Sequence, residues 1–287
     1  MAGFEICGVV TLFNPTNAHI SNIGTYIGAL GVLYVIDNSH PQNKEVWNGI
    51  RSRYDKVELL SYGKNIGIAA ALNLAIARAE DDGYVLLMTM DQDSYFEEEQ
   101  LLKYLKSLSE ISFDQVAIAS PAHLESEYVD SEHVVYERVE DVATSGNVIN
   151  LPVARMVGLF NEALFIDSVD HDYCLRANML GYDILQSSNC YLCHCIGEPY
   201  SGALLGFKKT FYIHSPKRMY FIVRNTLYIK SRYETHFPKY ARKYTKRMFE
   251  RASKCIRYSH RRWEYLRYIV MALSDYFLGR YGNRVNI

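Results

Sequence analysis

The sequence predicts an α/β protein with a mostly parallel central sheet flanked by helices, followed by a basic helical region. Apolar, β-branched runs alternate with helix-like stretches through the first two thirds of the chain, a pattern typical of βαβ units. From about Pro216 onward, Tyr, Leu, Ile and Met are interleaved with Arg and Lys, which indicates amphipathic helices.

Each element follows from local composition. Strands are predicted at residues 6–12, 32–36, 57–60 and 84–90, the last (YVLLMTM) being the clearest buried strand. Helices are predicted at residues 67–80, which are rich in alanine, and at residues 96–108, where leucines recur at helical spacing. Residues 122–142 are polar and acidic, so we expect a hairpin or an excursion from the sheet there.

Length and charge suggest two regions. The 287 residues, 49% of them hydrophobic, suit one large domain with an appendage, divided here into residues 1–205 and 206–287. Residues 1–204 hold 11 Lys and Arg against 28 Asp and Glu, whereas residues 205–287 hold 20 against 4 and carry 11 of the 24 tyrosines. This basic, aromatic region suits an anionic membrane surface, the acidic body of the same protein or another subunit. No recognised motif supports nucleic-acid binding.

The chain shows no run of about 18 apolar residues, so no membrane-spanning helix is expected. Its first ten residues include Glu5 and no basic residue, unlike a signal peptide. We therefore expect a cytoplasmic protein whose six cysteines are thiols.

The sharpest chemical signal is Asp91-Gln92-Asp93-Ser94 at the end of a buried strand. Two carboxylates at this spacing can converge on a hard cation such as Mg²⁺ or Mn²⁺. The alternative to a cation site is a purely structural role, in which these residues form a solvated turn and Ser94 caps the next helix. Position favours a site, because ligands of open α/β sheets bind beyond the carboxyl ends of the strands.

Three other strand ends carry polar residues of the same kind. Asp37 could accept a hydrogen bond from the N3–H of uracil or thymine, and Asn65 and Gly67 would let backbone approach a ribose or phosphate at a helix N-terminus. Taken singly, each of these ends is better explained by turn chemistry, whereas four polar strand ends in one sheet favour a binding site. The residues concerned are Thr11, Asn14, Asp37, Asn38, Asn65 and Gly67.

Two further clusters carry candidate chemistry. In the segment around Asp170 and Asp172, the carboxylates either stabilise the first turn of a helix or supply a general base. The segment Cys190-Tyr191-Leu192-Cys193-His194-Cys195 formally contains a haem-attachment pattern. We expect no haem there, because the sequence shows neither an export signal nor a helical haem pocket. A structural zinc site would need a second pair of ligands at zinc spacing, which the sequence does not supply. We therefore expect a strand with buried cysteines that presents His194 at its end.

Together these segments resemble family 2 glycosyltransferases of the GT-A fold, in particular the bacterial rhamnosyltransferase-like branch. The resemblance covers roughly residues 4–225, and the motifs occur in family order. They are VTLFNP (10–15), VIDNS (35–39), NIGIAAALN (65–73), MDQDS (90–94), TSGN (144–147), FIDSVDHDYCLRANMLGY (165–182), LCHCIGE (192–198) and YFIVRN (220–225).

The resemblance implies roles for the donor site. It places Asp37 at the base of a nucleotide-sugar and Asp91 near the ribose and the metal, Mg²⁺ or Mn²⁺. Asp93 and His194 would hold that cation on the diphosphate. The remaining nucleotide-pocket residues it implies are Thr11, Asn14, Asn38, Asn65 and Gly67.

The family's general base is the second residue of an acidic pair. Here Val169 replaces the first member, so the base maps onto Asp170, with Asp172 as second choice. The implied reaction is an inverting, metal-dependent transfer, with dTDP-L-rhamnose as the expected donor and a glycan or lipid-linked glycan as acceptor. The reaction would serve bacterial cell-surface polysaccharide synthesis. The protein would associate peripherally with the cytoplasmic face of the membrane, and a second copy of the chain is a further expected partner.

Alternatives stay open at this point. A galactofuranosyl- or hexosyltransferase would use a UDP-sugar with the same mechanism. A nucleotidyltransferase would need a glycine-rich, basic loop after the first strand, whereas residues 11–17 contain no Gly, Lys or Arg. A non-catalytic binding module would be favoured by lost carboxylates, yet Asp91, Asp93 and Asp170 are all present.

Overall fold

The computed structural model describes residues 5–41, 44–61, 63–123, 134–194, 199–204, 207–212 and 214–286. The chain forms two compact units, one of residues 1–160 and 173–195, the other of residues 161–172 and 196–287. Each unit has its own apolar core. The expected boundary between residues 205 and 206 lies outside the described residues and stays a prediction. A short segment before it, residues 161–172, groups with the C-terminal residues.

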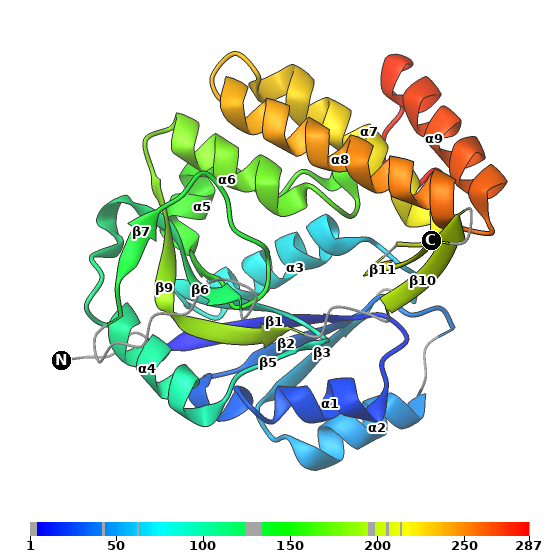
Figure 1. The fold of residues 1–287 in the computed structure, drawn as a ribbon. Coiled ribbons are helices and arrows are strands. Elements are labelled where there is room, and N and C mark those ends of the chain that lie inside the picture. Colours follow the sequence, from blue (N-terminus) through cyan, green and yellow to red (C-terminus); the bar gives the residue numbers. More distant parts are fainter. Residues whose placement is uncertain are drawn as a thin grey trace. The chain divides into compact units, whose positions relative to one another are not determined.

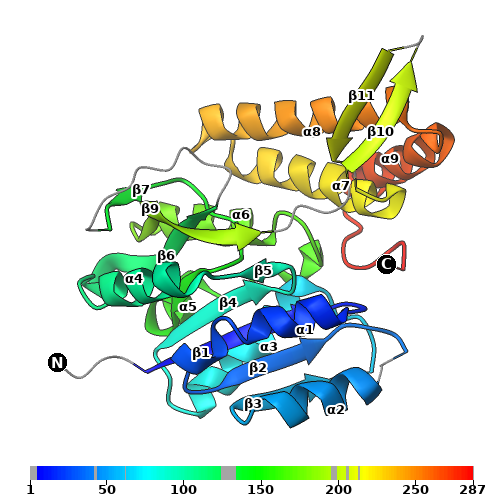
Figure 2. The same cartoon turned by 60° about the horizontal axis from the view of Figure 1, so that its bottom comes forward.

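A nine-stranded sheet forms the centre of the first unit (Figures 1 and 2). Its strand order is β3-β2-β1-β4-β8-β6-β9-β5, with β7 paired to β9. The strands are β1 (Ile6–Leu12), β2 (Leu33–Asp37), β3 (Val57–Ser61), β4 (Leu86–Asp91), β5 (Ser94–Tyr95), β6 (Val116–His123), β7 (Tyr136–Arg138), β8 (Val148–Asn150) and β9 (Asp183–His194).

The prediction of a mostly parallel sheet is correct for its first half. Strands β3, β2, β1 and β4 are parallel, whereas β8 runs antiparallel to both β4 and β6. The physical reason lies in the residues before β8: Gly146 donates its N–H to the carbonyl of Thr89, at the carboxyl end of β4. A strand that starts at that edge must run back along β4. The sheet beyond β4 is therefore mixed, with β6 and β9 parallel and β5 and β7 antiparallel to β9.

Helices cover both faces of this sheet, with α1 and α2 on one face and α3 on the other (Figures 1 and 2). In α3 the small residues Ala69, Ala71 and Ala75 are fully buried, which lets the helix approach β1 and β4 closely. The helices of this unit are α1 (Asn17–Ile23), α2 (Lys44–Arg53), α3 (Ile68–Asp81), α4 (Glu98–Leu108) and α5 (Leu151–Val157), with short 3₁₀ turns at Ile27–Ala29 and Phe113–Gln115. Helix α6 (Val169–Met179) begins in the second unit and continues in the first.

The predicted elements are all present, with boundaries shifted by one or two residues. The strands at residues 32–36 and 84–90 each end one residue later than expected, at Asp37 and Asp91. These two carboxylates therefore belong to the sheet and not to the turns after it. Of the predicted polar excursion, residues 124–133 lie outside the described part of the chain, and β7 within it adds an antiparallel pairing to β9.

The described part of the second unit contains three long helices, as its amphipathic pattern predicts, and a pair of antiparallel strands that the sequence did not predict. Helix α7 packs against both α8 and α9 over a core that includes Phe221, Met248 and Tyr265. The elements are a 3₁₀ turn at Glu162–Leu164, the strands β10 (Pro199–Leu204) and β11 (Phe207–Tyr212), and the helices α7 (Pro216–Tyr233), α8 (Pro238–Tyr258) and α9 (Arg262–Phe277). Helices α7 and α8 each begin with proline, which fits a first turn because that turn needs no donor there.

Two buried polar residues of α7 hold the segment that precedes α6. Arg224 is fully buried, and each of its guanidinium donors has an acceptor. The acceptors are the side chains of Asn225 and Tyr220 and the carbonyls of Ala163, Leu164 and Gly282. Tyr220 in turn donates to the buried carboxylate of Asp275, at 2.7 Å, so the positive charge is balanced through one hydroxyl.

The held segment has an unfavourable backbone conformation. Phe165, Asp167 and Ser168 have φ values of 67°, 61° and 65°, the left-handed region that residues other than glycine rarely adopt. The side-chain amide of Asn225 donates to three carbonyls of this turn, those of Leu164, Ile166 and Asp167, at 2.8–2.9 Å. These bonds, with those of Arg224, offset the strain of the turn.

We expect Arg224→Lys to destabilise the protein by about 3 kcal/mol, because an ammonium group leaves several buried carbonyls without a donor. Chemical or thermal unfolding followed by circular dichroism measures this loss. Arg232→Lys, an exposed position on the same helix, is the matched control and should change stability by less than about 0.5 kcal/mol. Equal effects at both positions would contradict the role given to Arg224.

Candidate functional site

The register of the parallel strands brings several predicted site residues to one edge of the first unit's sheet. Leu12 pairs with Asp37 across β1 and β2, and Thr11 pairs with Asp91 across β1 and β4. The carboxyl ends of three neighbouring strands thus place two carboxylates and the loop after β1 side by side. This edge is where open α/β sheets bind ligands.

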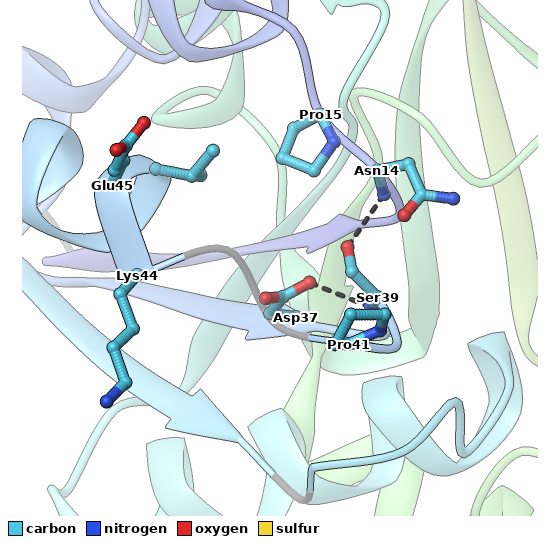
Figure 3. Close-up of a pocket in the computed structure, with 8 residues that line it drawn as sticks. Asn14, Pro15, Asp37, Ser39, Pro41, Lys44 and Glu45 are labelled. Carbon is cyan, nitrogen blue, oxygen red and sulfur yellow. Dashed lines mark hydrogen bonds between the residues drawn. The ribbon is translucent and has the colours of Figure 1, made fainter.

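A cavity of about 590 Å³ opens beside β2 (Figure 3). Its lining includes the buried carboxylate of Asp37, which is 3% exposed and accepts the N–H of Ser39 at 2.8 Å. The Ser39 hydroxyl accepts the N–H of Asn14, so the loops after β1 and β2 are joined at the mouth of the cavity. The cavity is lined by Asn14, Pro15, Asp37, Ser39, Pro41, Lys44, Glu45 and Val46.

The predicted residues Asn38 and Asn65 bond to the backbone that opens α3. The Asn38 side chain accepts from the N–H of Ile66 and donates to the carbonyl of Gly67, and Asn65 accepts from the N–H of Gly67. Gly67, at φ 83°, then starts the helix. Asn38 is buried, and its side chain holds this loop in place.

A second group of polar side chains lies at the end of β4. Asp91, Asp93 and His194 each offer a ligand atom, and these atoms lie within 4.8 Å of one another. His194 Nδ1 is 3.5 Å from Asp93 Oδ1, and all three side chains are partly exposed. His194 reaches the site from a distant part of the sequence because β9 pairs with β5 in a register that puts it opposite Ser94.

Ser94 is a site residue whose role the sequence did not reveal. Its hydroxyl bonds to His194 Nδ1 at 2.8 Å, so the interpretation of Ser94 as a helix cap is wrong. Helix α4 begins at Glu98, and its cap position is Glu97. The hydroxyl restrains the imidazole ring, and a hydrogen bond of this kind typically sets the orientation of a histidine toward a cation.

Two more side chains fix the loop that carries the carboxylates. The Gln92 amide both accepts from the N–H and donates to the carbonyl of Phe13, which ties the loop after β4 to the loop after β1. Ser145, in the TSGN motif, accepts the N–H of Asp91 at 3.0 Å. No periodicity or spacing in the sequence reveals these bonds, because each joins positions more than 50 residues apart.

The backbone conformation and close surroundings of Gly146 explain why the TSGN motif contains glycine. Its φ is 81°, and a Cβ there would lie 2.6 Å from the Pro121 side chain. The motif therefore approaches β6 more closely than any larger residue would allow.

The residues at this edge suit a divalent cation. Two carboxylates and one imidazole form a mixed oxygen and nitrogen donor set, typical of Mn²⁺ and compatible with Mg²⁺. The nearby cysteines do not contribute: Cys190 and Cys193 are buried in β9, and burial raises the pKa of the Cys190 thiol to about 12. The predicted strand that buries its cysteines and presents His194 is confirmed, while Cys195 lies outside the described residues.

The remaining predicted site residues belong to the second unit, at the start of α6. Asp172 is 1% exposed, and its Oδ1 accepts the hydroxyl of Tyr233 at 2.6 Å. The Asp170 side chain is 20% exposed and accepts the N–H of His171 at 2.9 Å. Of the two carboxylates, Asp170 is the one open to solvent.

His171 lies beside Asp170 and contacts two tyrosines of α8. His171 Nε2 lies 3.9 Å from Asp170 Oδ1, and His171 Nδ1 lies 2.7 Å from the Tyr240 hydroxyl. If the tyrosine donates this bond, the ring proton is on Nε2, on the side of the carboxylate. The ring also lies 4.5 Å from that of Tyr244, whose hydroxyl bonds to Ser168.

Comparison with known proteins adds a family and several relatives. Residues 23–164 match the sequence profile of glycosyl transferase family 2. A dTDP-rhamnosyl transferase of Shigella flexneri, RfbF, is 28% identical over 240 residues, which cover 77% of this chain and 78% of the relative.

Solved structures are similar in fold at low sequence identity. Residues 1–349 of S. aureus TarS in complex with UDP-GlcNAc align with a TM-score of 0.59 at 14% identity, covering 96% of this chain and 82% of the other. GalNAc-T7 with UDP, GalNAc and Mn²⁺ aligns with a TM-score of 0.57 at 11% identity over 67% of this chain. The present chain spans 44% of the length of GalNAc-T7. The fold is GT-A-like, as the sequence predicted.

Replacing Asp93 should weaken cation binding at the edge of the sheet. We expect Asp93→Asn to lower the affinity for Mn²⁺, titrated in the presence of a nucleoside diphosphate, by about tenfold or more, because a charged ligand is lost. Asp81→Asn, an exposed carboxylate at the end of α3, is the control and should leave the affinity unchanged. A cation affinity that is the same in both variants would refute the assignment.

Proposed function

Because the chain is a family 2 glycosyltransferase, we propose that it transfers L-rhamnose from dTDP-L-rhamnose to a glycan acceptor with inversion at the anomeric carbon. The observation that carries the choice of donor is the similarity to the Shigella dTDP-rhamnosyl transferase over three quarters of both chains. The pathway served would be cell-surface polysaccharide synthesis.

The cavity beside β2 supports a pyrimidine nucleotide. Asp37 is a buried carboxylate with one oxygen bonded to Ser39, and a carboxylate retains further lone pairs for an imide N–H such as that of thymine. Pro15, Pro41 and Val46 supply an apolar wall for a planar ring. Thr11, Asn14 and the loop held by Asn38 and Asn65 would complete the nucleotide pocket.

Asp91, Asp93 and His194 would hold Mn²⁺ or Mg²⁺ against the donor diphosphate. A bound divalent cation neutralises the negative charge that develops on a departing diphosphate. The protein's contribution is to fix the three side chains: Ser94 orients the imidazole, and Gln92 and Ser145 hold the loop that carries both carboxylates.

Asp170 is the proposed general base. A base must be accessible to the acceptor hydroxyl whose proton it takes, and Asp170 is partly exposed whereas Asp172 is buried. Asp172 already accepts a short bond from Tyr233, so we assign it a structural role between α6 and α7. As the acceptor oxygen bonds to the anomeric carbon, its proton passes to Asp170 and the bond to the nucleoside diphosphate breaks.

A UDP-sugar is the second candidate donor. A similar structure, S. aureus TarS, was solved with UDP-GlcNAc, and an aspartate at the base cannot by itself distinguish uracil from thymine. A galactofuranosyl- or hexosyltransferase would use the same residues.

The acceptor side of the proposal concerns the second unit. We propose a glycan or lipid-linked glycan acceptor and peripheral association with the cytoplasmic face of a membrane. No helix in the described part of the chain is long and apolar enough to cross a bilayer.

We expect release of nucleoside diphosphate from dTDP-L-rhamnose, dependent on Mn²⁺ or Mg²⁺ and abolished by a chelator. Parallel assays with UDP-galactofuranose and UDP-glucose provide the comparison. Turnover of a UDP-sugar alone would retain the mechanism and overturn the donor.

Asp170→Asn should lower turnover by about 10²–10⁴-fold while leaving donor affinity unchanged, because a general base contributes to the chemical step and not to donor binding. Asp172→Asn retains an acceptor for Tyr233 and should reduce turnover much less. Measured kcat and donor Kd for both variants separate the two assignments. A larger loss of turnover in Asp172→Asn would transfer the role of base to Asp172.

A further inference from the structure

Helix α9 presents an apolar stripe to solvent. Trp263 is 77% exposed, Val270 62% and Phe277 79%, and these residues recur every seven positions along one side of the helix. Leu273, at 37%, and Leu278, at 59%, extend the same side. A soluble surface helix normally places charged and polar residues there, so a stripe of this size indicates an interaction surface.

The stripe is not part of the core of the second unit. The opposite side of α9 is occupied by Tyr265, Ala272 and Asp275, which are all buried. Asp275 accepts a hydrogen bond from Tyr220 of α7, which fixes the rotation of α9 about its axis. The apolar stripe therefore faces away from α7 because of a buried polar contact.

The surroundings of the stripe are strongly basic. Residues 238–287 contain thirteen Lys and Arg against three Asp and Glu. Of these acids, Glu264 is paired with Arg261 at 2.6 Å and Asp275 is buried. Arg262 and Arg267 are exposed within α9, and Arg280 and Arg284 are exposed in the residues that follow it.

We propose that α9 lies in the interface of an anionic lipid bilayer, with Trp263, Val270 and Phe277 inserted below the headgroups and the flanking arginines on the lipid phosphates. The inference rests on the peripheral membrane association in the proposed function and names the element responsible for it. An amphipathic helix with Trp and Phe on one side and Arg beside them is typical of interfacial binding.

A second copy of the chain is the competing occupant of the stripe. Charge disfavours it, since an isologous contact through α9 would bring two basic regions of the same sign together. An anionic bilayer meets the same region with opposite charge.

The structure also distinguishes the two helices of the basic region. Helix α8 is the more basic, with eight Lys and Arg against two in α9. Its exposed side carries Lys239, Lys243, Lys246 and Arg257, and Phe249 is its one large apolar side chain that is exposed. Helix α8 can add electrostatic attraction, whereas insertion requires the apolar stripe of α9.

The test is co-sedimentation of the full chain with vesicles of phosphatidylcholine and phosphatidylglycerol at 3:1, and with phosphatidylcholine alone. We expect binding to the anionic vesicles, with weaker binding to neutral ones and in high salt because screening reduces the arginine contribution. Val270→Glu should reduce the partition coefficient by about tenfold or more, since it puts a charge in the inserted stripe. The matched control, Leu102→Glu on α4, alters a leucine of equal exposure, 61%, and should bind as the unaltered chain does.

Tryptophan emission gives a second measurement. On vesicle binding the emission should shift to shorter wavelength, and Trp263→Phe should remove that shift while leaving sedimentation nearly unchanged. Failure to bind anionic vesicles, or an equal loss in the Val270→Glu and Leu102→Glu variants, would overturn the proposal. So would a concentration-dependent dimer in light scattering that Val270→Glu dissociates, since a second copy would then occupy the stripe.

The outcome is separable from that of the proposed function. Hydrolysis of dTDP-L-rhamnose in the absence of acceptor and vesicles tests the donor assignment, and Val270→Glu should retain it in full. Vesicle binding without turnover of dTDP-L-rhamnose would support the inference about α9 and reject the donor assignment. Turnover without vesicle binding would support the donor assignment and reject the inference about α9.

Discussion

The buried pair Arg224 and Asn225 maintains a backbone conformation that the turn before α6 would not adopt alone. Three residues of that turn have positive φ without being glycine, at a typical cost of about 1–3 kcal/mol each. The two side chains of α7 offset this cost by donating to the carbonyls of the same turn. Because α6 starts directly after the turn, the direction of its first residues, Asp170 among them, depends on this contact.

In the first unit, strand pairing and side-chain hydrogen bonds hold the candidate site residues in position. Parallel pairing of β1 with β2 and β4 aligns strand ends, and hydrogen bonds of Gln92, Ser94 and Ser145 then restrain the loops beyond them. A cation site of two carboxylates and an imidazole requires positions accurate to a fraction of an ångström, which free loops do not provide. The restraining residues are polar side chains bonded to backbone or to the imidazole of His194.

Much of this arrangement could be anticipated from the sequence. The strand ending in Asp91, the alanine-rich helix α3 and the strand presenting His194 were all predicted, because apolar runs closed by polar residues carry a local signal. The mixed half of the sheet was not predicted, since β8 has three residues and its direction depends on a bond between Gly146 and Thr89. The grouping of residues 161–172 with the C-terminal helices was missed for a similar reason: its contacts are made with residues about 60 positions away.

The α/β class and several of the elements follow from the sequence, because periodicity and turn residues are local properties, and the motifs of the chain resemble those of the family. The sequence also identified Asp37, Asp91, Asp93, His194 and Asp170 as the residues to examine. Only the tertiary structure decided which of them lie together, that Asp172 is buried against Tyr233, and that Trp263, Val270 and Phe277 face solvent. Those outcomes depend on strand register and on the rotation of each helix about its axis, and both are set by contacts between distant segments.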